Sequence, residues 1–240
     1  MSRRHPKPSL PSRTLSVTWQ AVSLLLGYPD QDLIRRLPLI RKASDELPAA
    51  LAEPIRQTAV LLGSTPLTEL QQAYVETFDT RRRYNLFLTY FAHGDTRKRG
   101  VALLRFKQTY LRSGFLLQAD AAGGGELPDH LCVVLEYAAT VDQELGWGLL
   151  LDHRAGLELL RISLRDSGST WAPLLEALSR TLPALRGDEW EAVRQLAAVG
   201  PPEEEVGLDP YTGPSFDPAL EPRGVVAQAL PIPTFPEVRP

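Results

Sequence analysis

Apolar residues recur every three or four positions along most of this chain, from about residue 14 to about residue 199. Residues at this spacing share one face of an α-helix, which has about 3.6 residues per turn. The sequence contains no sustained alternation of apolar and polar residues and no Asn-Gly hairpin turn, the usual signs of strands. We therefore expect an all-α fold, a single globular domain of several helices. The predicted helices cover approximately 17–26, 30–47, 51–62, 67–78, 96–113, 128–145, 149–164, 173–182 and 188–199.

Proline positions sharpen three of these helix boundaries. Pro38 is expected to interrupt the second helix, because proline lacks the N–H group that a helix interior uses. Thr65 is expected to cap the fourth helix, with Pro66 at its first position. Pro128 is likewise expected at the first position of a strongly amphipathic helix.

The helix predicted over 96–113 has an unusual distribution of apolar residues. They occupy more than one of its faces and include Val101, Leu104, Phe106 and Leu111. A helix that is apolar on several faces is expected to be buried on several faces. We therefore place this helix at the centre of the fold.

The two ends of the chain differ in composition from the helical region. Residues 1–13 are basic and spaced by prolines, whereas residues 200–240 hold ten of the 21 prolines and the acidic run Glu203–Glu205. Such segments do not form helical hydrogen-bond ladders or bury enough apolar surface to offset their chain entropy. We expect a disordered basic arm over 1–13, a helical domain over 14–199 and a disordered proline-rich tail over 200–240.

Composition and charge are those of an ordinary globular protein, with 43% apolar and 23% charged residues. The net charge of −3 gives no global attraction to nucleic acid or to an anionic membrane. The single cysteine, Cys132, fits a reducing compartment and excludes an internal disulfide. Ser2-Arg3-Arg4 resembles a twin-arginine export signal, but the apolar run over 21–26 is too short for one. We expect a cytoplasmic protein without stable membrane insertion.

The sequence shows no recognisable catalytic or metal-binding pattern. The four histidines (His5, His93, His130 and His153) lack the spacing of metal ligands. No serine lies in a nucleophile-elbow pattern, and the glycine run 123–125 matches neither a phosphate-binding nor a dinucleotide-binding loop. We therefore expect no catalytic residue, no metal site and no stably bound cofactor, and we do not expect an enzyme.

Two basic runs, Arg81–Arg83 and Arg97–Arg99, allow two interpretations. Cations in the first turn of a helix oppose its dipole, so the second run is slightly unfavourable unless another group offsets it. Solvated charge or pairing with nearby acids such as Glu76 and Asp79 is the simpler interpretation. A nucleic-acid surface is the alternative, and it predicts strongly salt-dependent binding. The net charge and the acidic motifs argue against nucleic acid as a partner.

The segment Glu126-Leu127-Pro128-Asp129-His130 also has two interpretations. A helix start explains Pro128 and Asp129, because the first turn favours both residue types. It does not explain Glu126 or His130. A carboxylate, a proline ring and an imidazole next to a glycine loop are also suited to the polar rim of a peptide-binding site.

Four segments carry a resemblance to a known family. Tyr74–Arg83 and Leu88–Gly100 resemble the main motif of the nitrate reductase delta subunit (NarJ) family of molybdoenzyme assembly chaperones. Glu126–Leu131, with Leu135–Tyr137 after it, resembles the acidic-proline-aspartate-histidine loop of that family and of the related TorD-like chaperones. The resemblance spans roughly residues 14–200 and leaves out the arm and the tail.

The resemblance implies an all-helical protein that binds a client without catalysis. The implied partner is the N-terminal segment of the nitrate reductase catalytic α subunit, within the αβ apo-complex. The chaperone would keep this apoenzyme competent for insertion of the molybdenum cofactor. The alternative is a TorD-like chaperone that serves another, exported molybdoenzyme. The implied peptide-binding residues are Tyr74, Phe78, Asp79, Glu126, Pro128, Asp129 and His130.

Tyr74 and Phe78 are four positions apart and therefore share a helix face. They are expected either to anchor a client helix in an apolar groove or to pack in the core. The acids at Glu76, Asp79, Glu126 and Asp129 would suit a basic peptide.

Overall fold

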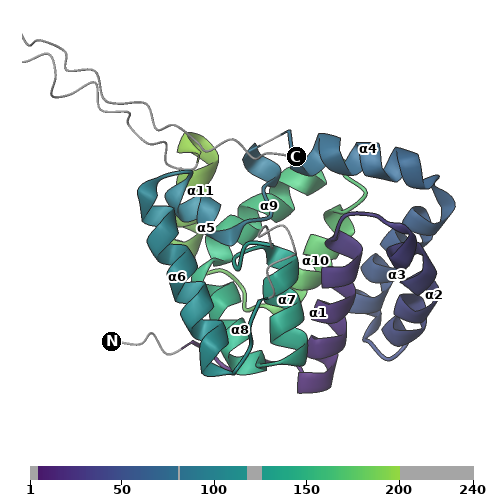
Figure 1. Cartoon of the computed structure of the whole chain (residues 1–240), viewed down its shortest axis with the longest axis horizontal. Coiled ribbons are helices and arrows are strands. Elements are labelled where there is room, and N and C mark those ends of the chain that lie inside the picture. The colour runs from purple at the N-terminus through teal and green to yellow at the C-terminus, as the bar shows by residue number, and fades with distance from the viewer. Residues whose placement is uncertain (1–4, 81, 118–125, 201–240) are drawn as a thin grey trace, which may run out of the picture. The chain divides into compact units, whose positions relative to one another are not determined.

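A computed structural model describes residues 5–80, 82–117 and 126–200 of the 240-residue chain. Within these ranges the chain forms eleven α-helices and one turn of 3-10 helix at Arg82–Tyr84, with no β-strand (Figure 1). The expectation of an all-α fold is therefore confirmed. The helices are α1 (Ser12–Leu26), α2 (Gln31–Ser44), α3 (Ala49–Ser64), α4 (Leu67–Phe78), α5 (Leu88–His93), α6 (Arg97–Arg112), α7 (Leu131–Thr140), α8 (Gln143–Asp152), α9 (Arg154–Asp166), α10 (Ala172–Thr181) and α11 (Gly187–Val199).

Helix α1 lies in the middle of the hydrophobic core. Its apolar stripe, which includes Leu15, Trp19 and Val22, is fully buried and packs against α7 and α10. Two hydrogen bonds fix these neighbours: the Trp19 indole N–H donates to Thr181 Oγ1 at 3.0 Å, and the Ser23 hydroxyl donates to the Cys132 carbonyl at 2.8 Å. Figure 1 shows α1 beside α7, with α2 and α3 on its other side. The period of the apolar residues was therefore enough to predict the existence of this helix, but not its start at Ser12 or the burial of Leu15 and Trp19.

The proline-based boundary predictions were wrong, each for a local reason. Helix α2 continues through Pro38. This residue lies on the exposed side of the helix, so the carbonyl that receives no N–H from proline is accessible to water. Thr65 ends α3 instead of capping α4, because its hydroxyl donates to the Leu61 carbonyl at 2.9 Å. Pro128 lies in a turn, and α7 begins three residues later at Leu131.

Two close helix approaches depend on glycine. A Cβ atom on Gly146 of α8 would lie 2.3 Å from the Cβ of Ala138 in α7. A Cβ atom on Gly156 of α9 would lie 2.8 Å from the Phe91 ring in α5. Glycine at these two positions allows α7 and α8, and likewise α5 and α9, to pack closer than a side chain would permit.

The helix predicted over 149–164 is divided at His153 into α8 and α9. The His153 Nδ1 lies 2.9 Å from the Leu149 carbonyl oxygen, and the imidazole contacts the Phe106 ring at 5.1 Å between centroids. Because a carbonyl accepts, the Nδ1–H group is the donor. The side chain thus uses the carbonyl that a continuing helix would offer to the backbone.

Helix α6 is not central, and that prediction was wrong. Only Ala102, Phe106 and Tyr110 of α6 are buried, whereas the apolar side chains of Val101, Leu104 and Leu111 are exposed. Apolar residues on a second face were therefore not a sign of burial in this helix.

The described part of the arm lies against α8. The Trp147 indole N–H donates to the Pro6 carbonyl at 2.8 Å, and His5 Nε2 lies 3.3 Å from Asp152 Oδ1. The rest of the predicted arm and the predicted tail, residues 1–4 and 201–240, lie outside the described residues. None of the helices in the described ranges is both long and apolar enough to cross a membrane.

Candidate functional site

The turn over residues 126–130 is bound along the segment that leads into α5. The Leu88 N–H donates to the Asp129 carbonyl at 3.0 Å, and the Leu131 N–H donates to the Leu86 carbonyl at 2.8 Å. Phe87 and His130 thereby form an isolated antiparallel bridge. Two segments about forty positions apart in sequence are joined at this point, and we call their junction the turn–α5 junction.

Asp129 supplies the main polar contact of the turn–α5 junction. Its carboxylate is fully buried, with Oδ2 accepting from the Thr89 N–H at 3.1 Å and from the Thr89 hydroxyl at 2.5 Å. Leu88 and Thr89 are the first two residues of α5, so Asp129 accepts two of the N–H groups that a helix start leaves without partners. A carboxylate at this end of a helix is also favoured by the helix dipole.

Arg99 connects α6 to the same junction. Its Nη1 donates to Asp95 Oδ1 at 2.9 Å, and its Nη2 lies 3.9 Å from Asp129 Oδ2. The guanidinium group also lies over the rings of Phe87 and Tyr90, 5.2 Å and 5.9 Å from their centroids. Arg99 therefore offsets the buried carboxylate, and this contact explains one of the three cations in the first turn of α6.

The Pro128 carbonyl accepts a hydrogen bond of 2.5 Å from the hydroxyl of Tyr110, which is fully buried. Burial, and then the negative charge of Asp129, raise the pKa of Tyr110 above its ordinary value. The phenol therefore stays protonated and keeps donating to the turn. Pro128 serves as the acceptor that fixes the turn on α6, not as the first residue of a helix.

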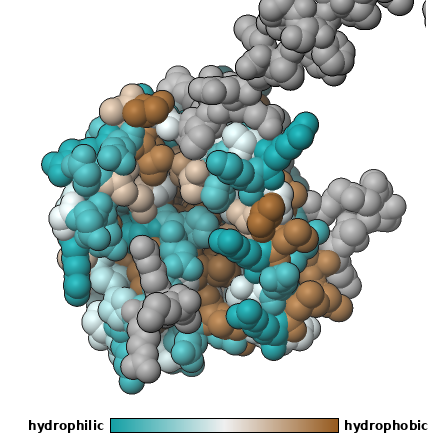
Figure 2. Space-filling view, turned by 90° about the vertical axis from the view of Figure 1, so that its left-hand side faces the viewer, coloured by the Kyte–Doolittle hydropathy of each residue, from teal (hydrophilic) through white to brown (hydrophobic). Residues whose placement is uncertain are grey.

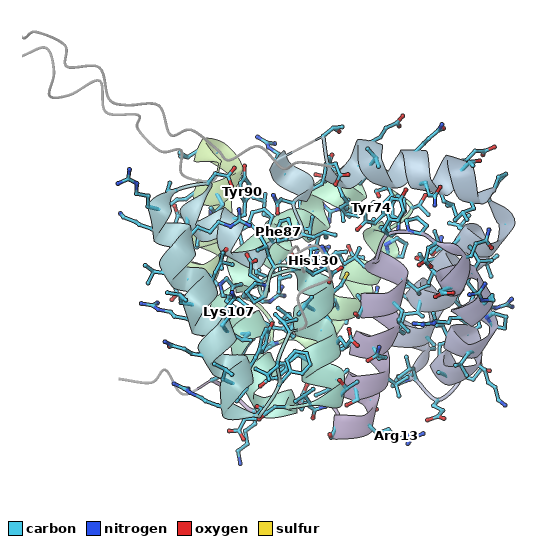
Figure 3. The ribbon with its side chains drawn as sticks, in the orientation of Figure 1. Arg13, Tyr74, Phe87, Tyr90, Lys107 and His130 are labelled. Atoms are coloured by element: carbon cyan, nitrogen blue, oxygen red, sulfur yellow. The ribbon has the colours of Figure 1, made fainter. Side chains whose placement is uncertain are left out.

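His130 lies at the edge of the junction, partly exposed, with its ring 5.1 Å from that of Phe87 (Figure 3). Burial lowers the pKa of His130, although the charges of Glu126 and Asp129 act to raise it. The imidazole is therefore neutral at neutral pH. Its Nδ1 is buried and has no hydrogen-bond partner among the described residues.

Tyr74 and Phe78 lie in the aromatic core of the α4 region. Their ring centroids are 4.6 Å apart, and both rings contact the buried Trp171, at 5.5 Å and 5.3 Å. The Tyr74 hydroxyl donates to the Leu26 carbonyl at 3.2 Å, and burial followed by the charges of Cys132, Asp79 and Glu126 raises its pKa. The two aromatic side chains therefore support the surface from below.

The remaining residues of the predicted site are on the surface. Asp79 ends α4 and is exposed, as are Glu126 and its neighbour Leu127. The charge of Glu126 acts to raise the pKa of Tyr74 in α4, of Cys132 in α7 and of His130 just before α7. The structure thus places the predicted residues around one region, with Asp79 and Glu126 facing solvent and the others buried or partly buried.

The one cysteine and the acidic side chains show no arrangement for chemistry. Burial, followed by the charges of Glu126 and Glu136, raises the pKa of the Cys132 thiol, which keeps it protonated. In the described ranges, no group of three or more His, Cys, Asp or Glu side chains could hold a metal ion.

Two hollows lie away from these residues. A cavity of about 530 Å³ lies between α5, α9 and α11, next to His153 and Leu196. A second, more apolar groove of about 340 Å³ lies between α1, α2 and α7, lined by Leu24, Leu39 and Ala139. Neither hollow is lined by the residues of the predicted peptide site.

The family model described as nitrate reductase delta subunit matches residues 44–177 of this chain, which is more than half of its 240 residues. The chain belongs to the nitrate reductase delta subunit family. The matched range contains the turn–α5 junction and all seven residues of the predicted site.

Named relatives of this delta subunit family member differ in length. The probable nitrate reductase molybdenum cofactor assembly chaperone NarJ of Bacillus subtilis is 32% identical over 167 residues, covering 69% of this chain and 88% of the relative. The chaperone NarJ of Escherichia coli K12 is 32% identical over 164 residues, covering 65% of this chain and 66% of the relative. The nitrate reductase-like protein NarX of Mycobacterium tuberculosis H37Rv is 40% identical over 173 residues, and this chain spans only 24% of its length.

Sequence reasoning missed Thr89, Arg99 and Tyr110 as parts of the site. Thr89 lies in α5, and Arg99 and Tyr110 lie in α6. These helices meet the turn over 126–130 only in the folded structure, so spacing along the sequence does not reveal the contacts. The one available signal was the basic first turn of α6 in this delta subunit family member, because unfavourable cations suggest a nearby carboxylate.

Proposed function

We propose that this chain is a dedicated assembly chaperone for a respiratory nitrate reductase. The observation that carries the proposal is the match to the delta subunit family over residues 44–177, together with 32% identity to relatives named as NarJ assembly chaperones. Those relatives are described as chaperones, and a buried thiol and an acidic surface support binding without catalysis. In this proposal the chain is not an enzyme.

The proposed client is the N-terminal segment of the catalytic α subunit, within the αβ apo-complex in the cytoplasm. The molybdenum cofactor is cargo for the client, and this chain holds no cofactor stably. Its role is to keep the apoenzyme open to cofactor insertion.

The proposed contact surface is the region around the end of α4 and the turn–α5 junction. Asp79 and Glu126 are exposed there and would favour a basic segment, which raises the association rate and the selectivity. Val75 shares a helix face with Asp79, and with Leu127 it adds exposed apolar area beside the acids. Tyr74, Phe78, Pro128 and Asp129 hold this surface in shape from below.

A peptide of the α subunit N-terminus should bind the full-length chain with micromolar or tighter affinity in calorimetry. Reversing the exposed charges with Asp79→Lys and Glu126→Lys should weaken binding by at least about tenfold, because close charge pairs at interfaces often couple by more than about 1.5 kcal/mol. Glu53→Lys on α3, an exposed acid far from the junction in sequence, is the matched control and should leave the affinity unchanged. No detectable heat with folded protein would refute the proposal.

His130→Ala should weaken peptide binding by about tenfold while costing about 1 kcal/mol or less in stability, because the ring is only partly buried. Binding is measured by calorimetry and stability by thermal unfolding. A large loss in melting temperature with unchanged affinity would assign His130 to the fold instead.

The alternative client is an exported molybdoenzyme of the type served by TorD-like chaperones. A competition experiment between two client peptides distinguishes this alternative from the proposed client. If a twin-arginine leader peptide displaces the α-subunit peptide and binds more tightly, the client proposed above is wrong.

A further inference from the structure

The outward face of α6 carries an apolar crest that no described residue covers. Val101 and Leu104 are each 57% exposed and Leu111 is 56% exposed, and Leu116, just beyond the helix, is 69% exposed. Val101, Leu104 and Leu111 are three and seven positions apart, so they follow one line along the helix. This line lies opposite the buried residues Ala102, Phe106 and Tyr110.

Basic side chains flank the crest on both sides. Lys98 and Arg105 follow one side of the helix, Lys107 lies on the other side, and Arg112 lies near its end. None of these four forms an ion pair with another described residue, and all four are exposed. Helix α6 itself contains no acidic residue.

The first turn of α6 contains three cations, Arg97, Lys98 and Arg99, where a helix dipole favours acids. Arg99 is explained by its contacts with Asp95 and Asp129. Lys98 is exposed and has no comparable contact among the described residues. An anionic surface outside the molecule would offset this unfavourable charge.

The arrangement is that of a helix that lies flat on an interface. The apolar side chains are at the centre of the outward face and the cations are at its borders, so insertion of the crest would bring the cations level with lipid phosphates. Figure 2, which views the side of the molecule that carries α6, shows apolar side chains in brown among hydrophilic ones. Figure 3 shows Lys107 on this helix, on the left-hand side of the molecule.

We propose that the outward face of α6 is a docking surface for an anionic lipid bilayer. Charge complementarity favours this occupant, because the face combines unpaired cations with a central apolar line. Nucleic acid is a poorer fit, since the apolar crest would occupy the position where phosphates need cations. A bilayer satisfies both parts of the face. This inference does not depend on the identity of the client.

Sedimentation of the full-length chain with vesicles tests the proposal. The protein should partition onto vesicles of phosphatidylcholine mixed with phosphatidylglycerol and not onto phosphatidylcholine alone, and binding should fall as salt is raised. The double variant Arg105→Glu/Lys107→Glu should weaken partition by at least about tenfold. Leu104→Ser/Leu111→Ser should also weaken it about tenfold, because it removes the inserted apolar area.

Matched variants control for charge and for exposed apolar area elsewhere. Arg41→Glu/Lys42→Glu on α2 makes the same change in net charge, and Val60→Ser/Leu61→Ser on α3 removes similar exposed side chains. Both should partition like the parent protein, and circular dichroism confirms that every variant is folded. The basic arm is tested with Arg3→Ser/Arg4→Ser, which should also leave partition unchanged.

Three outcomes would overturn the proposal. The first is equal partition of the α6 variants and the parent protein. The second is loss of binding in the arm variant while the α6 variants still bind. The third is retention on double-stranded DNA that the α6 charge variant abolishes, with no binding to vesicles. Failure of any client peptide to bind would leave this inference intact, because the vesicle assay contains no client.

Discussion

Asp129 is a fully buried carboxylate whose contacts come from two other segments, Thr89 of α5 and Arg99 of α6. Such a group stabilises a fold only while its partners are in place, because removing one partner leaves the other buried and unpaired. The side chain therefore supports the candidate surface without being able to reach a client. Its role is to position the turn that carries Glu126 and His130.

Replacing this carboxylate should be costly. Asp129→Ala should lower the free energy of unfolding by about 3 kcal/mol, because it leaves the Thr89 N–H and hydroxyl without their buried acceptor and removes the charge that faces Arg99. The change is measured by urea unfolding monitored by circular dichroism. The matched control is Asp79→Ala, an exposed acid of the same predicted site, which should stay within about 0.5 kcal/mol of the parent protein. Equal effects of the two variants would contradict the structural role of Asp129.

The partly buried imidazole of His153 makes stability depend on pH. Burial lowers the pKa of His153, although its hydrogen bond to the Leu149 carbonyl and nearby acids act to raise it. The folded state therefore favours the neutral ring, and the stabilisation is complete above the ordinary pKa of about 6.5 and is lost as the pH falls below it. The loss is at most about 1.4 kcal/mol per pH unit from this residue.

His153→Asn tests this assignment, because asparagine keeps a donor near the Leu149 carbonyl but does not titrate. Melting temperatures of the variant and the parent protein should run parallel above about pH 6.5 and converge toward acid pH. Burial also lowers the pKa of His130, so the melting temperature of the variant should still fall somewhat at acid pH. Parallel curves over the whole range would show that His153 does not contribute.

The motif Glu126–His130 could be singled out from sequence, since a helix start accounts for Pro128 and Asp129 but not for Glu126 or His130. That Pro128 lies in a turn before α7 was not predicted. The partners of Asp129 could not. Thr89 and Arg99 come from helices that meet the turn only in three dimensions, and Tyr74 and Phe78 are equally consistent with a groove or a core until Trp171 is placed beside them. Local pattern predicts residue type and helix face, not tertiary neighbours.

The contact between α7 and α8 depends on one missing side chain. Gly146→Ala should lower the free energy of unfolding by about 1–3 kcal/mol, because the added Cβ would lie 2.3 Å from that of Ala138. Gly148→Ala on the same helix is the matched control, since its Cβ meets only the edge of the His5 ring at 3.4 Å. The control should be neutral or stabilising by a few tenths of a kcal/mol, because alanine favours helix over glycine. The stability of both variants is measured by thermal unfolding. Equal destabilisation of the two would argue against the close approach of α7 and α8 at Gly146.

At the level of helices, the sequence predicted those that carry apolar residues at a regular helical spacing, such as α1 and α3. It failed where the deciding factor was the environment of a side chain. Pro38 is tolerated within α2 because its side of the helix is exposed, and α6 lies at the surface although Val101 and Leu104 are apolar. Neither exposure can be deduced from periodicity alone.

One hydrophobic core includes residues from all the helices α1 to α10. Three of the four tryptophans, Trp19, Trp147 and Trp171, are buried in it and come from different parts of the chain. A core shared by nearly all the described helices favours one cooperative unfolding transition of this part of the chain.

Tryptophan fluorescence and far-ultraviolet circular dichroism should therefore give coincident unfolding curves in urea. Trp171 lies beside Tyr74 and Phe78, so its emission reports on the α4 region, whereas the dichroism reports on all helices. An earlier fluorescence transition would mean that the surroundings of at least one tryptophan open before the helices unfold, and would contradict a single cooperative unit.

The short ladder between the turn and α5 has a consequence for exchange with solvent. The amide protons of Leu88, Thr89 and Leu131 are bonded across the same junction, two of them to Asp129. They should therefore be released together in a single opening event and show similar protection against deuterium. A ligand bound to residues 126–130 would slow the exchange of all three amide protons together. Their protection therefore reports whether the turn is occupied, even if no side chain of α5 contacts the ligand.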